Sequence, residues 1–404
     1  MSQQWLYPIF GIYGYRVTKC EPDERCLRLH IEAHPHKVCC SQCRSRDVIR
    51  RGEQVRWLRN LPVGGIVSWL IIQIPRVECR SCGVVRQIRL GLAEERRSYT
   101  RAFARYVLEL SQLMTIKDVA EHLGVSWDVV KDIQKSHLAK HYAKPALKDV
   151  KQIAIDEICV GRGYRFVTIV LDLDSGAILF VGEGKRADSL RPFWRRLHSA
   201  QARVQAVAID LSPAYQKAVK RHLPKATVVF DRFHVVKLLN QKLTQLRRQL
   251  YRQATTDLKK KVLKGTRWLL LKNPENLDPV KGEPGRLRAA LRLNESLAIA
   301  YYLKEDLRQI WEQPDKRTAR SKLIDWYHQA MSSGIRVLHD FARTLLKHAP
   351  GILAWYDYPI STGPLEGTNN KIKTLNRQHY GLRDRDFFRL KLYQLHETKY
   401  ALVG

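Results

Sequence analysis

Residues 152–171, with the sequence QIAIDEICVGRGYRFVTIVL, decide the fold prediction for this chain. Apolar and polar side chains alternate on both sides of Gly161 and Gly163, and such alternation is typical of β-strands joined by a turn. A further apolar run follows the turn-forming residues 174–176. The pattern therefore predicts three successive antiparallel strands, at 152–156, 164–171 and 177–182.

Helix and strand patterns alternate after the third strand. Apolar strands are expected at 204–210 and 227–231, and helices at 187–200, at 213–222 and from 233 onward. Because parallel strands need a crossover between them, and the crossover is usually a helix, this alternation predicts parallel αβ units. Three antiparallel strands followed by parallel αβ units are the order of an RNase H-like sheet.

Two acidic residues end apolar strands of this predicted sheet. Asp156 follows Ile153 and Ile155, and Asp210 follows Val207 and Ile209. The first and fourth strands are neighbours in an RNase H-like sheet, so the two carboxylates are expected to meet at one edge, where binding sites form. Neither aspartate is specific alone, since Asp commonly begins a turn after a strand.

A third acidic residue lies in the run STGPLEGTNNKIK, residues 361–373. Pro364 suits the first turn of a helix. A helix that starts there places one carboxylate beside amides and cations on a single face. That face combines a metal ligand with phosphate contacts; the alternative is a capped surface helix with an acidic first turn. The residues of the face are Glu366, Asn369, Asn370, Lys373 and Arg377.

The charge of the whole chain indicates a polyanionic partner. The 404 residues include 71 Lys and Arg against 39 Asp and Glu, which gives a net charge of +32,. Membrane lipid is the competing polyanion, but the longest apolar run, 64–75, is too short to span a bilayer,. The N-terminus lacks the pattern of a secretory signal. We therefore expect a protein that stays in the cytoplasm with DNA.

The cysteines predict a structural zinc site. Cys40 and Cys43 form one Cys-x-x-Cys pair, and Cys79 and Cys82 form another after intervening strand-like stretches at 55–58 and 66–74. Two such turns complete a closed tetrahedral Zn²⁺ site, as in a zinc ribbon. Cysteines in the cytoplasm stay reduced, which favours metal ligands over disulfides. Cys39 or His36 remains an alternative ligand to Cys40, and two chance pairs in a small core remain the other interpretation.

Residues 100–138 predict a helix-turn-helix. A capping box at 115–118 starts one helix, Gly124 makes the turn, and Ser126 caps the next,. Ala120 permits close helix packing and Val130 points inward. The second helix would then present four side chains to a DNA major groove; the alternative is an ordinary helical hairpin. These side chains are Trp127, Asp128, Lys131 and Lys135.

Residues 242–348 are helical and polar in character and offer no obvious nucleophile. The three tryptophans of this segment are interpreted as core residues rather than as a surface for stacking. They are Trp268, Trp311 and Trp326.

The motifs together resemble the ISL-three family of insertion-sequence transposases, and the resemblance covers nearly the whole chain. Its most specific stretches here are 364–373 and Phe230-Asp-Arg-Phe-His234. The resemblance implies a DDE catalytic triad of Asp156, Asp210 and Glu366 that holds Mg²⁺ or Mn²⁺. Related DDE families carry an Asp-x-x-His element whose histidine, here His234, contacts the scissile phosphate or steadies the site. Where the family often has Cys-Pro-x-Cys, this chain has Cys40-Ser-Gln-Cys43.

The expected architecture is an α+β multidomain chain in which an all-helical insertion interrupts an RNase H-like α/β catalytic domain. A zinc-ribbon domain and a helix-turn-helix DNA-binding domain precede it. The expected boundaries are 1–98 for the zinc ribbon, 99–148 for the helix-turn-helix, 149–240 and 349–404 for the two catalytic parts, and 241–348 for the insertion.

The function implied is that of a DDE transposase of a bacterial insertion sequence. It would bind double-stranded terminal inverted repeats and target DNA, with metal-dependent cleavage and strand transfer by three carboxylates. Joining two ends argues for a homodimer in the synaptic complex. Two alternatives stay open: a non-enzymatic DNA-binding regulator, and an RNase H-like structure-specific nuclease such as a junction resolvase.

Overall fold

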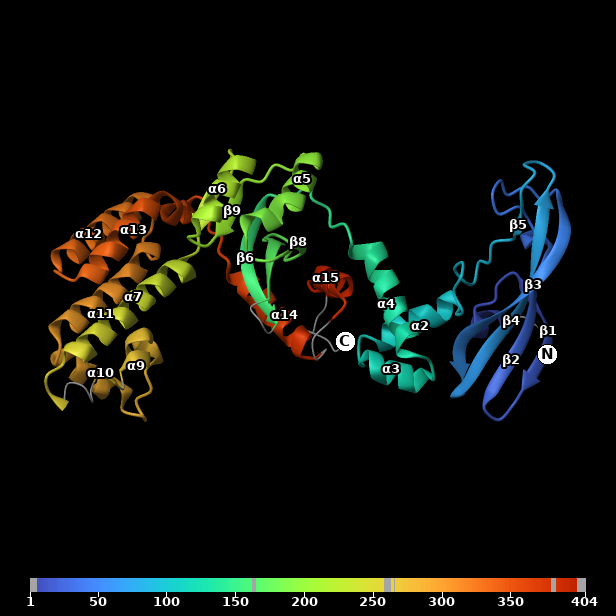
Figure 1. The fold of residues 1–404 in the computed structure, drawn as a ribbon, viewed down its shortest axis with the longest axis horizontal. Coiled ribbons are helices and arrows are strands. Elements are labelled where there is room, and N and C mark those ends of the chain that lie inside the picture. The colour runs from blue at the N-terminus through green and yellow to red at the C-terminus, as the bar shows by residue number, and fades with distance from the viewer. Residues whose placement is uncertain (1–5, 162–164, 258–262, 265, 379–382, 398–404) are drawn as a thin grey trace. The chain divides into compact units, whose positions relative to one another are not determined.

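The computed structural model describes residues 6–161, 165–257, 263–264, 266–378 and 383–397. They form two compact units (Figure 1). Of the described residues, the N-terminal unit contains 6–143, 377–378 and 383–390, and the central unit contains those from 144 to 376 together with 391–397. Among the described residues, no helix has the length and apolar character that crossing a membrane requires.

A five-stranded sheet organises the first part of the N-terminal unit, after the short helix α1 (Leu6–Phe10). Its strands run in the order β1-β2-β4-β3, with β5 paired to β4. The strands expected at 55–58 and 66–74 are confirmed inside β3 and β4, a long hairpin whose turn at Gly64 and Gly65 has positive φ,. The strands are β1 (Tyr15–Pro22), β2 (Cys26–Ala33), β3 (Val48–Val63), β4 (Ile66–Cys79) and β5 (Val85–Gln87).

Three helices follow, and they form the predicted helix-turn-helix. The capping box of Thr115 and Asp118 is confirmed, Gly124 has φ of 60°, and the Ser126 hydroxyl accepts the N–H of Val129. Val130 is fully buried, as expected. Each start therefore depends on a local hydrogen bond that the sequence specifies. The helices are α2 (Arg101–Leu110), α3 (Ile116–Leu123) and α4 (Trp127–Tyr142).

Residues from near the C-terminus complete this helical core. Phe387 and Leu390 of α15 (Arg385–Gln394) are buried against Phe103, Val107 and the other apolar side chains of α2, α3 and α4. Phe387 has no exposed surface. The core of the helix-turn-helix is thus built from two segments far apart in the sequence.

The central unit contains a second five-stranded sheet in the order β10-β9-β6-β7-β8. β6, β7 and β8 are antiparallel neighbours, and β9 and β10 run parallel to β6. The predicted strands and their directions are confirmed, except that Tyr164, the expected start of the second, lies outside the described residues. The strands are β6 (Gln152–Gly161), β7 (Arg165–Asp172), β8 (Ile178–Glu183), β9 (Ala206–Ile209) and β10 (Thr227–Phe230).

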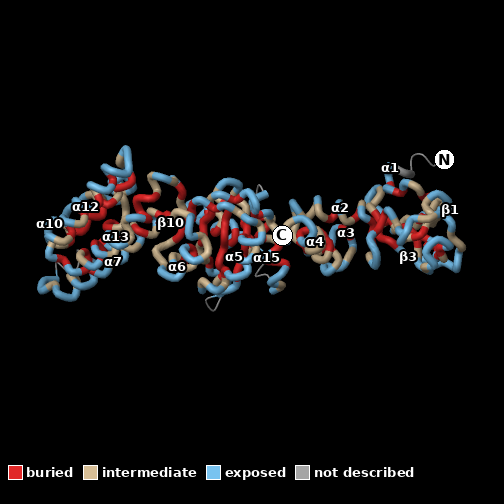
Figure 2. The backbone as a smooth tube through the Cα atoms, turned by 90° about the horizontal axis from the view of Figure 1, so that it is seen from above, coloured by how far each residue is buried: buried red, intermediate tan, exposed pale blue. Residues whose placement is uncertain are grey.

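Helices pack against this sheet, and the residues of β7, β8 and β9 are mostly buried, as is much of the surrounding part of the unit (Figure 2). Phe193, Trp194 and Leu197 of α5 (Arg191–Ser199) and Tyr215 and Val219 of α6 pack into the same core as the strands. α6 (Pro213–His222) crosses between β9 and β10, as the parallel arrangement of these strands requires,.

The chain between β10 and the Glu366 helix is helical. Trp311 and Trp326 are buried as interpreted, but Trp268 is 66% exposed, so its assignment to the core is wrong. The guanidinium of Arg267 lies 4.7 Å from the ring centroid of Trp268, which stays at the surface. The helices here include α7 (Arg232–Gln253), α9 (Arg267–Leu271), α10 (Glu283–Arg292), α11 (Glu295–Arg308), α12 (Lys316–Ser332) and α13 (Arg336–Leu353).

Candidate active site

Asp156 and Asp210 lie at the same level on neighbouring strands. The parallel ladder of β6 and β9 pairs Ile153 with Val207 and Ala154 with Ala208. Continuing that register by two residues on each strand brings Asp156 beside Asp210. Adjacent strands are about 4.8 Å apart, so the two carboxyl groups share one edge of the sheet, as the sequence predicted.

Asp156 and Asp210 form a row of aspartates at this edge of the sheet, and a third aspartate, Asp231, extends the row. Phe230 of β10 pairs with Ile209 of β9, and the N–H of the next residue, Asp231, donates to the Ile209 carbonyl at 3.2 Å. Asp231 is 4% exposed and accepts a hydrogen bond from the hydroxyl of Thr362. Sequence reasoning named Asp231 only as part of the Asp-x-x-His element; its position directly after an apolar strand was the available signal.

The helix that carries Glu366, α14 (Gly363–Gln378), lies along β6. Nδ2 of Asn369 donates to Oδ2 of Asp156 at 3.1 Å, and Nδ2 of Asn376 donates to the Val160 carbonyl at 2.6 Å. Thr362, the residue before α14, donates to Asp231. Three contacts thus join α14 and the residue before it to β6 and to the aspartates at the sheet edge.

Asn369 is a buried residue in this arrangement, 9% exposed, and its Oδ1 has no hydrogen-bond partner among the described residues. It was predicted to contact DNA together with Asn370, Lys373 and Arg377. The other three are exposed on α14, whereas Asn369 would have to leave Asp156 to reach a DNA strand.

Glu366 is exposed and lies one helical turn before Asn369. Its helix is therefore fixed at the row of aspartates, while its own carboxylate remains accessible to solvent. Within the described ranges, the only group of three or more Cys, His, Asp or Glu ligand atoms all within 4.8 Å of one another is a cysteine cluster. The three predicted catalytic carboxylates thus share a region but are not gathered into a tight cage.

The electrostatics of the row disfavour a second negative charge. Burial raises the pKa of Asp156, and the negative charge of Asp210 adds to the rise, while His234 and the Asn369 amide oppose it. His234 lies in the first turn of α7, close enough for its charge to act on Asp156. Burial likewise raises the pKa of Glu157, although the Tyr215 hydroxyl donates to its Oε1 at 2.6 Å. A bound cation would relieve this crowding.

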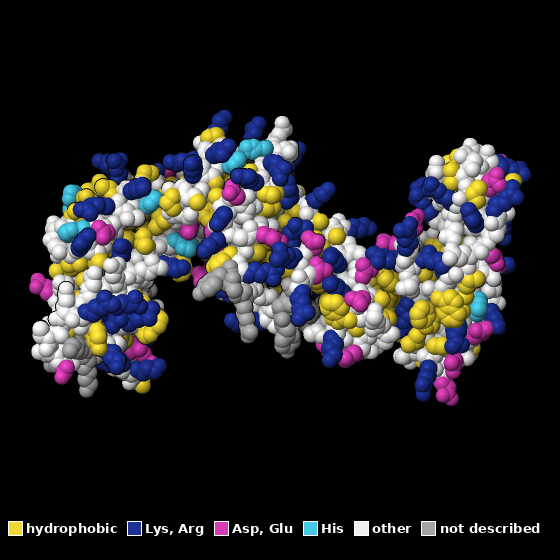
Figure 3. All heavy atoms as spheres, in the orientation of Figure 1, with side chains coloured by type: hydrophobic (Ala, Val, Ile, Leu, Met, Phe, Trp, Pro, Cys, Tyr) yellow, Lys and Arg dark blue, Asp and Glu magenta, His cyan; other side chains and the backbone are white. Residues whose placement is uncertain are grey.

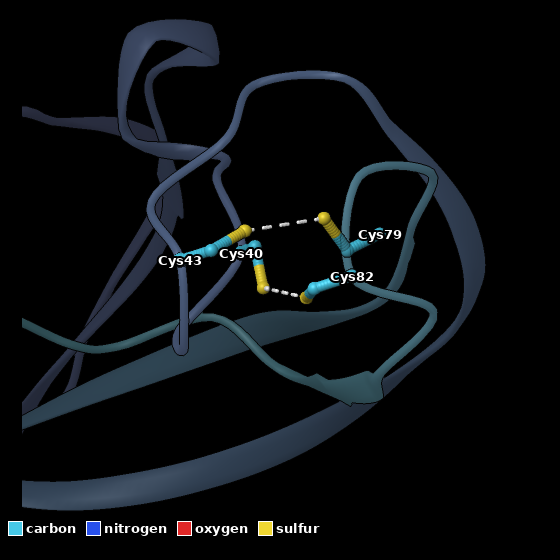
Figure 4. A group of neighbouring side chains, drawn as sticks. All are labelled: Cys40, Cys43, Cys79 and Cys82. Atoms are coloured by element: carbon cyan, nitrogen blue, oxygen red, sulfur yellow. Dashed lines mark hydrogen bonds between the residues drawn. The ribbon is translucent and has the colours of Figure 1, made fainter.

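The four predicted zinc ligands do come together (Figure 4). The sulfurs of Cys40 and Cys82 are 3.6 Å apart, those of Cys43 and Cys79 are 3.4 Å apart, and all four lie within 4.8 Å of one another. The alternatives Cys39 and His36 are not in the cluster. The N–H groups of Cys43 and Gln42 lower the pKa of Cys40 to about 6, which favours the thiolate that binds metal,. The cluster is compatible with a structural zinc site.

The predicted DNA-reading face of α4 is partly occupied by the chain itself. Trp127 is 46% exposed, and Nζ of Lys131 lies 5.2 Å from its ring centroid. Lys131 and Lys135 both form ion pairs with Asp384, at 3.1 and 2.9 Å. Asp384 also caps α15 by accepting the N–H of Phe387, and this bond and the two lysines hold its pKa well below the usual range.

Comparison with known proteins agrees with these features. Residues 153–392 match a family described as "Transposase", and residues 88–138 match the helix-turn-helix domain of transposase family ISL3. The transposase of insertion sequence element IS1001 from Bordetella parapertussis is 32% identical over 398 residues, which are 97% of this chain and 98% of the relative. The IS1557 transposase of Mycobacterium tuberculosis is 27% identical over 373 residues, 85% of this chain and 82% of the relative.

Among solved structures, the Drosophila P element transposase strand transfer complex matches 76% of this chain and 94% of its own at 11% identity and a TM-score of 0.41. A TM-score of 0.41 is too low to carry a conclusion about the fold. The sequence matches, which span most of the chain, define a transposase with a helix-turn-helix DNA-binding domain. The chain belongs to the ISL3 family of transposases, as its motifs predicted.

Proposed function

We propose that this transposase cleaves and joins DNA at the ends of a bacterial insertion sequence, with Asp156, Asp210 and Glu366 as its catalytic carboxylates. The observation that supports this most is the register that aligns Asp156 with Asp210, combined with the Asn369 bond that anchors the Glu366 helix to Asp156. Three acidic residues from three distant segments would thus act at one end of the sheet.

The central sheet would be an RNase H-like fold. Its order of three antiparallel strands flanked by two parallel ones supports this assignment. The helices α7 to α13 stand between β10 and α14 in the chain, as an insertion at 241–348 between catalytic parts at 149–240 and 349–404 would require. The zinc-ribbon domain would comprise residues 1–98, and the helix-turn-helix domain would comprise residues 99–148.

The side chains at the row suit hard divalent cations. Carboxylate oxygens and the unpaired, buried Oδ1 of Asn369 are oxygen donors, which Mg²⁺ and Mn²⁺ prefer,. Two such ions, when bound, supply activation of the attacking oxygen and stabilisation of the leaving oxygen. Asp156 and Asp210 would hold the metals, Glu366 would complete one coordination shell, and Zn²⁺ would occupy the cysteine cluster.

The reaction would proceed in two displacements without a covalent protein intermediate. Water would attack phosphorus at the element end, a P–O3′ bond would break, and the released O3′ would take a proton. That 3′-hydroxyl would then attack a phosphorus of target DNA and displace another O3′. His234, close to Asp156, would contact the scissile phosphate or steady the carboxylates.

The DNA partners would be the terminal inverted repeats and a target duplex, which the protein would meet in the nucleoid. A homodimer would join the two ends of the element. Trp127, Lys131 and Lys135 of α4 would read the repeat, and Asn370, Lys373 and Arg377 of α14 would contact the backbone near the cleaved bond. These residues are exposed or half-buried on their helices.

The decisive test is cleavage of labelled duplex that carries the gene's own flanking repeats, with and without Mg²⁺, by wild type and E366Q. We expect metal-dependent nicking at the repeat boundary that is lost in the variant. Nicking by E366Q at the wild-type rate would refute the assignment of the third carboxylate.

Two other functions make different predictions in the same assay. A DNA-binding regulator would bind the repeat tightly without cleaving it in any metal. A junction resolvase would cleave branched DNA in preference to linear repeats, whatever the sequence of the arms. The match to the helix-turn-helix of transposase family ISL3 favours the transposase over both.

A further inference from the structure

An arginine-lined cleft lies in the N-terminal unit, outside the helix-turn-helix face. It has a volume of about 710 Å³ and is bordered by β4, β5 and the segment that leads to α2. Ser41, from the turn between Cys40 and Cys43, also lines it. The arginines that line the cleft are Arg56, Arg76, Arg86, Arg89, Arg96 and Arg101.

The charges of this cleft are not neutralised within the protein. Two glutamates, Glu94 and Glu95, also line it, yet in the described part of the chain none of the six arginines has a carboxylate oxygen within 4.0 Å. Other arginines of the same unit are paired: Arg51 with Glu78 at 2.7 Å, and Arg80 with Asp47 at 3.7 Å. Lys and Arg side chains are spread over the surfaces of both units (Figure 3), but here six converge on one hollow.

Arg56 donates a hydrogen bond to the Arg97 carbonyl, which carries no net charge. Convergence of guanidinium groups that lack a carboxylate partner is unfavourable without an anion, because like charges repel each other. A guanidinium offers planar pairs of N–H donors that match phosphate oxygens. The backbone of Arg96 is a second observation at this cleft, because its φ of 62° lies in the left-handed region that favours glycine. Strain of this kind collects at binding sites.

We propose that the cleft is a second DNA-binding site, which grips the phosphate backbone of duplex DNA independently of base sequence. The proposal rests on the proposed transposase function, which supplies the DNA. Small-molecule pockets are mostly apolar, whereas arginine dominates this lining, so a polyanion fits better than a metabolite,. Because the Cys40–Cys43 turn forms part of the rim, the zinc site would also stabilise the cleft.

The test is equilibrium binding of the full-length, zinc-loaded chain to fluorescent duplexes without Mg²⁺, over a series of salt concentrations. The test variant is R76Q/R86Q. The matched control is R25Q/R50Q, which removes two exposed arginines of the same unit, one in the β1–β2 turn and one in β3, that lie outside the cleft and have no carboxylate within 4.0 Å among the described residues. Binding is measured on the terminal repeat and on an unrelated duplex.

We expect R76Q/R86Q to weaken binding to both duplexes by about tenfold and to reduce the slope of log affinity against log salt by about 1.8, because each lost phosphate contact removes about 0.9. The control should keep the wild-type slope. Unchanged binding by R76Q/R86Q, or tighter binding of an RNA duplex than of DNA, would overturn the proposal.

If thermal melting shows that R76Q/R86Q is less stable than wild type, R89Q/R96Q, which removes two other arginines of the cleft, serves as the test variant in its place. Failure of the cleft and failure of the proposed function stay distinguishable, since binding is measured without catalysis. If the wild-type protein nicks repeats and both double variants keep the wild-type salt slope, the cleft is not a DNA-binding site, but the protein remains a transposase. A wild-type chain that binds no duplex refutes both.

Discussion

The cysteine cluster and the row of carboxylates are two candidate metal centres built in opposite ways. The four thiols come from two tight turns and lie within 4.8 Å of one another before any metal is considered. Asp156, Asp210 and Glu366 come from a strand, a strand end and a helix, and Glu366 remains exposed. The first centre needs two local turns and the β3–β4 hairpin that brings them together, whereas the second needs a parallel sheet register and a docked helix.

The difference corresponds to what each centre would do. A structural metal has to be enclosed and held permanently, so a closed set of four soft ligands suits it. A catalytic centre has to admit a substrate, so part of its ligand set stays open. Half-buried Asp156 and Asp210, whose charges act on each other, together with an exposed Glu366 on the helix anchored to Asp156, fit the second requirement.

The largest effect is expected at the carboxylate centre. D210N should lower the rate of strand cleavage by about 10³-fold or more, because the neutral amide cannot replace a metal-binding carboxylate. Affinity for the repeat should stay at the wild-type value, since cleavage and binding use different residues. D174N, which changes an exposed aspartate of the β7–β8 turn, is the control for nicking kinetics. Equal rates for D210N and D174N would remove Asp210 from the site.

The cysteine centre should respond in stability rather than in chemistry. C43S should abolish zinc binding and lower the free energy of unfolding of the N-terminal unit by about 4 kcal/mol, because loss of a structural metal is among the most destabilising changes. Metal analysis and thermal melting measure the two quantities. C20S changes an exposed cysteine of the same sheet and should alter neither. A C43S protein that keeps one zinc per chain would contradict the ligand set.

The neighbouring asparagines Asn369 and Asn370 separate positioning from DNA contact. N369A should lower the cleavage rate by about 10- to 100-fold and raise the metal concentration needed for half-maximal activity, because Asp156 loses its hydrogen-bond donor,. N370A, at an exposed position, should weaken DNA binding and leave the metal dependence unchanged. Identical metal titrations for N369A and wild type would exclude a positioning role.

Acid should weaken both centres by protonating their ligands. The N–H groups of Cys43 and Gln42 lower the pKa of Cys40 to about 6, whereas the pKa of Cys43 is raised to about 12, because the Ser45 N–H is outweighed by the Cys79 and Cys82 thiols. Zinc binds thiolates, so the zinc content should fall as acid protonates the cluster. The pKa of Asp156 is raised by burial, so its proton competes with the metal at a higher pH than for an ordinary aspartate. Zinc content and Mg²⁺-dependent cleavage measured across the acid range report the two effects. Cleavage that persists unchanged into the usual pKa range of an aspartate would contradict the second.

The smallest expected effect concerns the recognition helix. D384N should tighten DNA binding by about fivefold, since Lys131 and Lys135 would be released to phosphate and half-exposed ion pairs are worth about 1 kcal/mol,. Asparagine keeps the cap of α15, so the fold should be preserved. D386N, in the first turn of the same helix, is the control. Weaker binding by D384N would mean that Asp384 holds the two lysines in the orientation that DNA requires.

Local patterns predicted the elements well because they depend on neighbouring residues. The Thr115 and Ser126 caps, the Gly124 turn and the alternation in β6 and β7 all form where the sequence specified them. The cysteine ligands were predictable for the same reason, since each pair lies within a single turn. Trp268 was misassigned because an aromatic residue in a helical segment does not reveal which face is covered.

Contacts between distant segments could not be predicted in this way. Nothing near Thr362 indicates that its hydroxyl bonds to Asp231, and nothing near Asp384 indicates a pairing with two lysines of α4. The two asparagines at 369 and 370 are chemically identical in the sequence, yet one is buried on Asp156 and the other is exposed. Such differences depend on which helix face docks.

The sequence by itself determined the ISL3 family, the strand and helix pattern, the four cysteines of the cluster and the identity of the three acidic candidates, because motifs and periodicity are properties of neighbouring residues. The tertiary structure alone decided that Asp231 joins Asp156 and Asp210, that α14 is anchored to Asp156, that Asp384 pairs with the α4 lysines, and that six arginines without a carboxylate partner line one cleft. These depend on strand register and on packing between segments far apart in the chain, which local patterns do not encode.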